Sequence, residues 1–166
     1  MATDMSCADY LDIDLNAQKL SVIRDGQVCR DFIVSTAKNG PGEEMGSECT
    51  PRGWHKIKAK IGAKAPLYTV FSGRRATGEI YTTGLATINP ERDWILTRIL
   101  WLVGLEPGRN RYGPVDSGWR YIYIHGSPDD LVTATPQSHG CVRMKNNDAV
   151  ALFDLAVVGE RVLIHE

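Results

Sequence analysis

Apolar and polar residues alternate along the N-terminal part of the chain with the period of two that marks a half-buried β-strand. The run Tyr10-Leu11-Asp12-Ile13-Asp14-Leu15 shows this alternation clearly. The pair Asp25-Gly26 separates two such runs and favours a tight hairpin turn, because glycine accepts a positive φ. The pattern predicts strands at residues 10–15, 20–24, 28–34, 54–61 and 67–71, with a loop over residues 35–53.

The middle of the chain is harder to assign. Residues 89–93 (NPERD) have the cap, the early proline and the acids of a helix start. Residues 94–103 (WILTRILWLV) fit a buried helix or a buried strand, and we favour a strand because breakers follow at Gly104 and Pro107-Gly108. Residues 106–118 form a long polar loop, and long ordered loops in compact domains are often functional.

The last part of the chain contains one more strong strand and one clear helix. Residues 119–124 (WRYIYI) combine aromatic and β-branched side chains and predict a strand that delivers His125 at its end. Residues 146–148 (NND) are typical of a helix cap, and the helix is expected to run to Val157, with Gly159 as its stop. A closing strand follows at residues 161–165. The sequence therefore predicts a mainly β fold, in a single domain over residues 1–166.

Composition and charge indicate which kinds of binding partner the protein is not expected to have. The formal net charge is −1 and no basic block occurs, which argues against nucleic acid and against a polybasic membrane-surface patch. Residues 1–14 contain neither a basic region nor an apolar run of signal-peptide length, and no transmembrane helix is indicated elsewhere. We therefore expect a cytoplasmic protein that acts on a small substrate, and nothing in the sequence indicates its oligomeric state.

The cysteine pattern points away from metal binding. Cys7, Cys29, Cys49 and Cys141 include no CxxC pair, so a structural zinc site is not expected, and no cofactor is predicted. In a reducing cytoplasm free thiols are expected rather than disulfides. Cys29 lies in a strand-like run and is interpreted as a small core residue. Cys7 and Cys49 lie in polar segments and receive no role.

The segment Ser138-His139-Gly140-Cys141-Val142-Arg143 could carry nucleophilic chemistry. A thiol needs a nearby base to ionise, and both His125 and His139 are candidates. Gly140 leaves room for a substrate carbonyl, backbone N–H groups beside it could donate to an oxyanion, and Arg143 adds a positive charge. The alternatives are a tight turn beside a core cysteine, or a metal site built from the two histidines and the thiol.

The two motifs together resemble a known family. Ile124-His125-Gly126-Ser127, followed by Ser138-His139-Gly140-Cys141-Val142-Arg143-Met144, is similar to the catalytic motif of the L,D-transpeptidases, the YkuD-type domain of bacterial cell-wall enzymes. The likeness extends to residues 34–37, to the Thr50-Pro51-Arg52-Gly53 loop and to residues 95–105. These segments span most of the chain.

This resemblance implies a β-sandwich-like catalytic fold with one or two short helices. It also implies that Cys141 attacks the peptide bond between an L-centre and a following D-residue, with His125 as base and acid, oriented by a backbone carbonyl near Gly126. The resemblance also implies that His139, Gly140 and Arg143 occupy the family's oxyanion-binding and substrate-pocket positions. Ser138 is expected to shape the turn through a hydrogen bond.

The absence of an export signal makes the chain similar to the family's cytoplasmic L,D-carboxypeptidases. These enzymes remove the terminal D-alanine from murein tetrapeptides, free or nucleotide-linked, during cell-wall recycling. The alternative is an exported L,D-transpeptidase that forms crosslinks and whose leader is not part of this sequence. A terminal carboxylate favours arginine, for which the candidates are Arg109, Arg111, Arg120 and Arg143, and Tyr112 is expected to wall the pocket.

Overall fold

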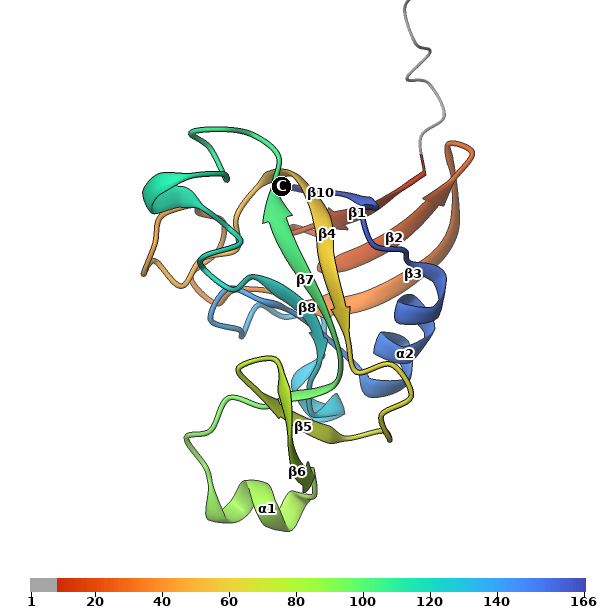
Figure 1. Ribbon diagram of the computed structural model, residues 1–166, viewed down its shortest axis with the longest axis vertical. Helices are drawn as coiled ribbons and strands as arrows, with labels where there is room; N and C mark the ends of the chain where they lie inside the picture. The colour runs from red at the N-terminus through yellow and green to blue at the C-terminus, as the bar shows by residue number, and fades with distance from the viewer. Residues whose placement is uncertain (1–8) are drawn as a thin grey trace, which may run out of the picture.

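A closed, barrel-like β-sheet forms most of the structure (Figure 1). The computed structural model describes residues 9–166, and in this part of the chain the sheet has ten strands. The strands are β1 (Tyr10–Asp14), β2 (Lys19–Arg24), β3 (Gln27–Ser35), β4 (Gly53–Ile61), β5 (Thr69–Ser72), β6 (Arg75–Ile80), β7 (Ile95–Gly104), β8 (Tyr123–Gly126), β9 (Val142–Met144) and β10 (Arg161–His165). The helices are α1 (Thr83–Ile88) and α2 (Asn146–Leu155), with 3-10 turns at Gly113–Val115 and Asp129–Leu131.

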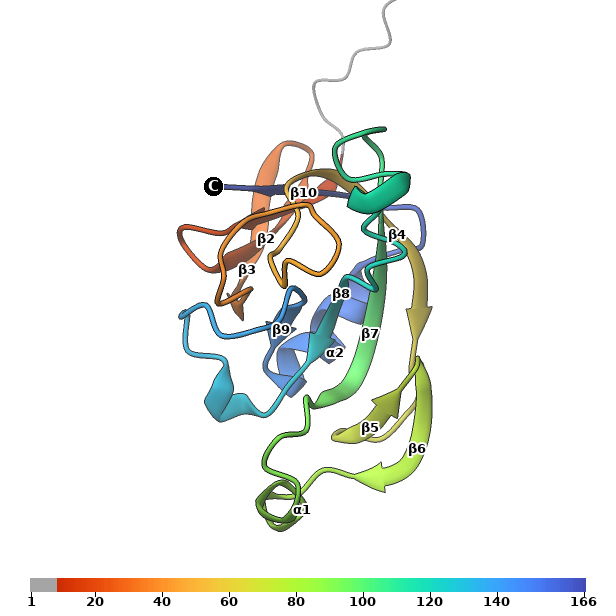
Figure 2. The same ribbon diagram turned by 90° about the vertical axis from the view of Figure 1, so that its left-hand side faces the viewer.

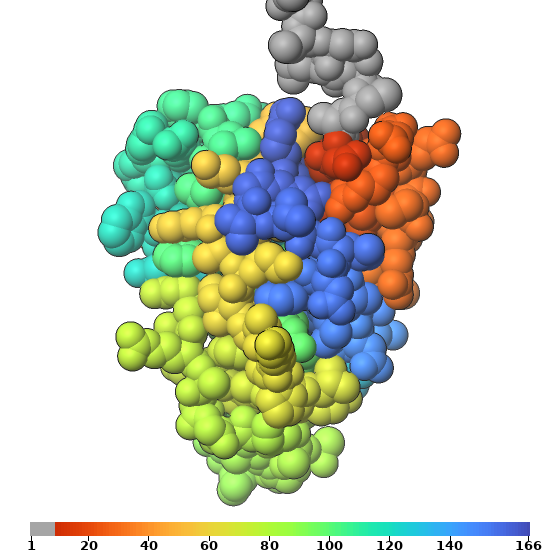
Figure 3. Space-filling view, turned by 45° about the vertical axis from the view of Figure 1, so that its right-hand side comes forward, coloured from red at the N-terminus to blue at the C-terminus, as the bar shows by residue number. Residues whose placement is uncertain are grey.

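The strand order explains why the sheet closes. It runs β4-β10-β1-β2-β3-β9-β8-β7, and β7 also pairs with β4, which joins the two ends. Strands β5 and β6 extend from β7 and, with α1, form a lobe at the lower end of the molecule (Figures 1 and 3). The mainly β prediction is confirmed, and closure removes the free edges that an open sandwich would leave.

The main core lies inside this sheet and under α2. The predicted alternation of β1 is present, with Leu11 and Ile13 fully buried. Helix α2 packs against β7 and β8, and its Leu152 and Phe153 belong to the same buried cluster. Neither helix in residues 9–166 has the length and apolar character that crossing a bilayer requires.

Two elements differ from the sequence predictions. Residues 89–93 do not start a helix, because the short helix α1 precedes them and Asn89 is its C-terminal cap. Residues 119–121 form turns rather than a strand, and Trp119 is 71% exposed. The aromatic side chains of this segment, Trp119 and Tyr121, are exposed, whereas Ile122 is buried in the main core, and β8 begins only at Tyr123.

Two smaller predictions also need correction. Helix α2 begins at Asn146 with Lys145 as its N-cap, and it ends at Leu155, two residues earlier than expected. The Asn146 amide is buried and donates to the Ser127 carbonyl, so this side chain packs inside the fold instead of capping the helix. Cys29 is exposed on β3 and is not a core residue. Cys7 lies outside the described residues.

Candidate active site

The thiol of Cys141 lies immediately before β9, beside the first residue of β8. The backbone N–H of Tyr123 donates to Cys141 Sγ at 3.3 Å, and the thiol donates to the Tyr121 carbonyl at 3.4 Å. Burial raises the pKa of Cys141 to about 11, although the Tyr123 N–H and the charges of Arg143 and Arg120 act in the opposite direction. The resting thiol is therefore protonated at neutral pH, and it needs a base to react.

Strands β8 and β9 lie side by side (Figure 2), and their parallel pairing brings His125 to the same face as this thiol. In the register Ile124 lies opposite Val142 and His125 lies opposite Arg143. Cys141 is two residues before Arg143, so side-chain alternation places it on the same face, diagonal to His125. Diagonal neighbours of this kind are within reach of aromatic and long side chains.

His125 is buried and held by its own backbone. Its Nδ1 lies 2.7 Å from the Gly126 carbonyl, and the Ser127 hydroxyl is 3.5 Å away. Because a carbonyl only accepts, Nδ1 carries the proton and Nε2 is left as the acceptor nitrogen. Burial lowers the pKa of His125, so the imidazole is neutral at rest. Within residues 9–166 no hydrogen bond joins it to Cys141, whose thiol donates to the Tyr121 carbonyl instead.

The turn that carries the thiol is fixed by Ser138. Its hydroxyl donates to the Cys141 carbonyl at 2.6 Å and accepts from the Gly140 N–H at 3.2 Å. The Gly140 N–H is thus already engaged, whereas those of His139 and Cys141 have no acceptor within residues 9–166. These two groups are the ones free to receive a negative oxygen.

Thr50 supports the same turn from a distant part of the chain. Its buried hydroxyl donates to the Gly140 carbonyl at 2.9 Å and accepts from the Ala37 N–H at 3.0 Å. Gly140 has a φ of +129°, and a Cβ at this position would lie 3.2 Å from the Cys49 carbonyl oxygen. The sequence marks Thr50 as part of a family-like loop, but only the fold shows that it holds the nucleophile turn.

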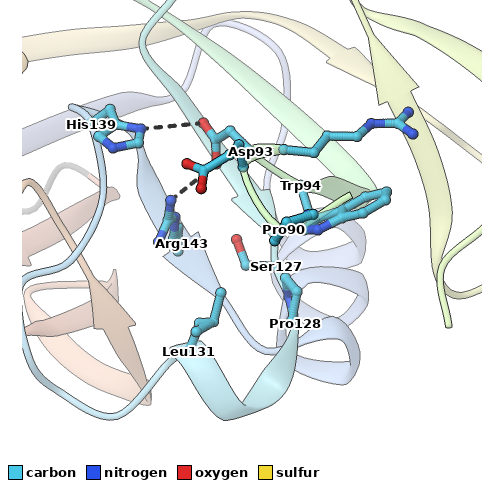
Figure 4. Close-up of a pocket in the computed structure, with 10 residues that line it drawn as sticks. Pro90, Asp93, Trp94, Ser127, Pro128, Leu131, His139 and Arg143 are labelled. Carbon is cyan, nitrogen blue, oxygen red and sulfur yellow. Dashed lines mark hydrogen bonds and ion pairs between the residues drawn. The ribbon is translucent and has the colours of Figure 1, made fainter. Parts of the chain in front are cut away.

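A pocket of about 200 Å³ adjoins this turn at His139 and Arg143 (Figure 4). Arg143 is nearly buried and donates to Asp93 Oδ1 at 3.0 Å, and His139 Nδ1 lies 3.9 Å from Asp93 Oδ2. Asp93 therefore balances the charge of Arg143. The sequence interpretation missed this carboxylate, because it assigned residues 89–93 to a helix start.

Two of the other predicted arginines, Arg120 and Arg109, have partners elsewhere, whereas Arg111 lines a second pocket. Arg120 donates to the carbonyls of Gly42, Glu43 and Cys49, so it holds the loop beside the nucleophile turn. Arg109 forms an exposed pair with Glu106 at 3.3 Å. Each of these side chains has a structural contact that accounts for its position.

A second pocket, of about 360 Å³, is lined by Tyr121, whose carbonyl accepts from the thiol. Tyr112 lines it, together with Trp101, Trp119 and Tyr121, and its assignment to the substrate pocket stays a prediction. Asp116 shapes the rim by accepting from the N–H groups of Tyr112 and Trp119. Within residues 9–166, no three His, Cys, Asp or Glu side chains are grouped in a way that would hold a metal ion.

Comparison with known proteins gives a consistent result. Residues 8–164 match the model of the YkuD family, described as the L,D-transpeptidase catalytic domain. No curated protein matches the chain significantly.

Solved structures share the fold at low sequence identity. An L,D-transpeptidase from Xylanimonas cellulosilytica is 23% identical with a TM-score of 0.57, over 98% of this chain and 63% of that one. An L,D-transpeptidase from Mycobacterium smegmatis is 21% identical with a TM-score of 0.57, over 96% and 59%. An L,D-transpeptidase in complex with imipenem is 20% identical with a TM-score of 0.58, again over 96% and 59%. The chain thus spans about three fifths of these structures.

Proposed function

Because the chain belongs to the YkuD family of L,D-transpeptidase catalytic domains, which are cysteine-dependent acyl-transfer enzymes, we propose that it acts on peptidoglycan stem peptides as an L,D-carboxypeptidase. In this proposal it removes the terminal D-alanine from a murein tetrapeptide, free or nucleotide-linked. The observation that carries the proposal is the placement of Cys141 diagonal to His125 on one face of β8 and β9, with Nδ1 of His125 held by the Gly126 carbonyl.

The first half of the reaction forms a thioester. When substrate binds, the Cys141 thiol leaves the Tyr121 carbonyl and turns to His125, whose Nε2 accepts its proton. Hydrogen bonds of this kind often tighten only in the substrate complex. The sulfur attacks the carbonyl carbon of the L-centre, and the N–H groups of His139 and Cys141 receive the oxyanion. The C–N bond then breaks, and His125 gives its proton to the departing amine.

Water completes the cycle in a carboxypeptidase. His125 removes a proton from water, the resulting hydroxide attacks the thioester, and the thiolate leaves and is reprotonated. The pocket between Asp93 and His139 supports a small leaving group, since about 200 Å³ lies below the range of 300–1,000 Å³ that suits a drug-sized ligand. A single D-residue fits such a space better than a second stem peptide.

The second candidate is transpeptidation, in which an amine replaces water. It is favoured by the solved structures, all three of which bear the name L,D-transpeptidase. The two candidates differ only in the acceptor, so one experiment separates them. A defined tetrapeptide is incubated with the protein, with and without a second stem peptide whose amine can act as the acyl acceptor. The products are identified by mass spectrometry.

The carboxypeptidase proposal predicts tripeptide and free D-alanine in both mixtures. A crosslinked dimer as the main product would replace it with transpeptidation. No release of D-alanine from any tetrapeptide, by protein whose Cys141 still reacts with a thiol reagent, would end both. Cys29→Ala is the matched control, because that thiol is exposed on β3 and its loss should leave turnover unchanged.

A further inference from the structure

Three cationic side chains surround the pocket that adjoins Tyr121, which we name the Trp101 pocket. Lys58 Nζ lies 4.1 Å from the centre of the Trp101 ring, and the Arg74 guanidinium lies 4.6 Å from the same ring. Arg111 lies 4.7 Å from the Tyr112 ring. All three line the pocket, so its wall combines aromatic faces with positive charge.

These cations have no acidic partner in the described part of the chain. Five arginines elsewhere in residues 9–166 form ion pairs with carboxylates. None of the three pocket cations, Lys58, Arg74 and Arg111, forms such a pair. The acid in the pocket wall, Asp116, is occupied by two backbone N–H groups of the rim. The pocket therefore presents net positive charge to a ligand, and a ligand carboxylate would find donors that no protein carboxylate satisfies.

Three residues that line this pocket have a left-handed backbone conformation. Gly73 and Arg74 form the two-residue turn between β5 and β6, with φ values of +54° and +64°. Arginine occupies a left-handed position where such a turn favours glycine, and this places its guanidinium over the Trp101 and Tyr121 rings. Tyr112 and Tyr121 also have positive φ values, of +69° and +55°. Backbone strain of this kind persists only where surrounding contacts hold the residue in place, and it is common at ligand-binding sites.

The pocket is connected directly to the nucleophile. Arg74 Nη1 donates to the Tyr123 hydroxyl at 2.9 Å, and the backbone N–H of Tyr123 donates to Cys141 Sγ at 3.3 Å. Tyr121 lines the pocket, and its carbonyl accepts from the thiol. A ligand in the Trp101 pocket would thus contact Tyr121, whose carbonyl holds the thiol, and this pocket shares no lining residue with the pocket at Asp93.

We propose that the Trp101 pocket binds the part of the acyl donor that precedes the scissile bond, and that it selects a peptide carrying carboxylates there. The carboxylates would lie against Lys58, Arg74 and Arg111, and the peptide's apolar atoms against the aromatic rings. This assignment rests on the proposed function for the choice of ligand, but the charge selection can be measured without turnover.

The test uses the full chain with Cys141→Ala, which binds but does not react. Two synthetic tetrapeptides are compared by calorimetry at low salt, one with free carboxylates before the scissile bond and one with these groups amidated. We expect the acidic peptide to bind roughly fivefold to tenfold more tightly, because exposed ion pairs contribute modestly and three cations take part. The difference should shrink as salt is added.

Variants then assign the preference to the pocket. Arg74→Gln with Lys58→Gln should remove most of the difference between the two peptides, whereas Arg30→Gln, a surface change on β3, should leave it intact. Lys58→Gln alone, on an exposed position of β4, provides a variant with an unchanged turn. Equal affinity for the two peptides, absence of binding, or a preference that survives the double variant would overturn the proposal. Failure of the proposed function would show itself separately, as absence of D-alanine release by the unaltered protein.

Discussion

The state of the Cys141 thiol before substrate binds leads to the sharpest prediction. Its pKa is raised to about 11 by burial, and the neighbouring His125 is neutral. The pair should therefore rest as thiol and imidazole, not as thiolate and imidazolium. The perturbation is alkylation of the unaltered protein with iodoacetamide over a range of pH, followed by peptide mass spectrometry that measures each cysteine separately.

The expected magnitude follows from two opposing effects. A pKa about two units above the ordinary value of 9.0 lowers the thiolate fraction at neutral pH about 100-fold. The more basic thiolate is also more nucleophilic, by roughly tenfold for a Brønsted coefficient of 0.4–0.5. The net expectation is that Cys141 reacts about tenfold more slowly at neutral pH than an ordinary exposed thiol. Because the thiolate fraction grows as pH rises, the rate should keep increasing until about pH 11.

The exposed Cys29 provides the comparison within the same molecule. Reaction of Cys141 that is faster than that of Cys29 at pH 7, with a rate that is already constant above pH 6, would refute the reasoning. Such a result would mean that a thiolate–imidazolium pair exists before substrate arrives. The proton transfer to His125 would then belong to the resting enzyme and not to the reaction.

Three further predictions concern the base, the turn and the pH range. His125→Ala should lower turnover by about 10²–10⁴-fold but leave alkylation of Cys141 near neutral pH unchanged, because no hydrogen bond joins the resting thiol to His125 within residues 9–166; turnover close to that of the unaltered protein would point to His139 as the base. Thr50→Val leaves two buried backbone groups without partners, and chemical denaturation should show a loss of about 2–6 kcal/mol, which Thr50→Ser should largely avoid. Burial lowers the pKa of His55 to about 4, so the unfolded chain takes up a proton first, and about 3 kcal/mol of stability should be lost as pH falls from 6.5 to 4. His55→Gln should flatten this part of the stability profile, and an equally steep profile would contradict that assignment.

The fold could be predicted from the sequence in segments where alternating apolar residues are the ones that are buried. Residues 10–24 form their predicted strands because apolar side chains of β1 and β2 lie in the core, and β3 reaches the core from Phe32 onward. The segment of β6 and α1 was not predicted, since α1 has no buried residue and therefore no apolar period. The aromatic residues at 119–122 misled for the opposite reason, because their rings belong to an exposed turn and a pocket wall.

The candidate site was predictable only in its local part. The motif around Cys141, with His125 at a strand end, is visible in the sequence, and the YkuD family assignment is confirmed. The roles of these two residues stay predictions. Contacts made through the fold, such as that of Thr50 with Gly140 or of Arg143 with Asp93, join segments 90 and 50 residues apart and leave no local pattern.

Trapping of the covalent intermediate tests the central claim most directly. The protein is mixed with a defined tetrapeptide, quenched in acid within the first turnovers and digested, and the modified residue is identified by mass spectrometry. We predict a tripeptidyl thioester on Cys141, with one D-alanine released for each adduct. An adduct on another residue, or D-alanine release by the Cys141→Ala protein at the same rate, would contradict the assignment of Cys141 as the nucleophile.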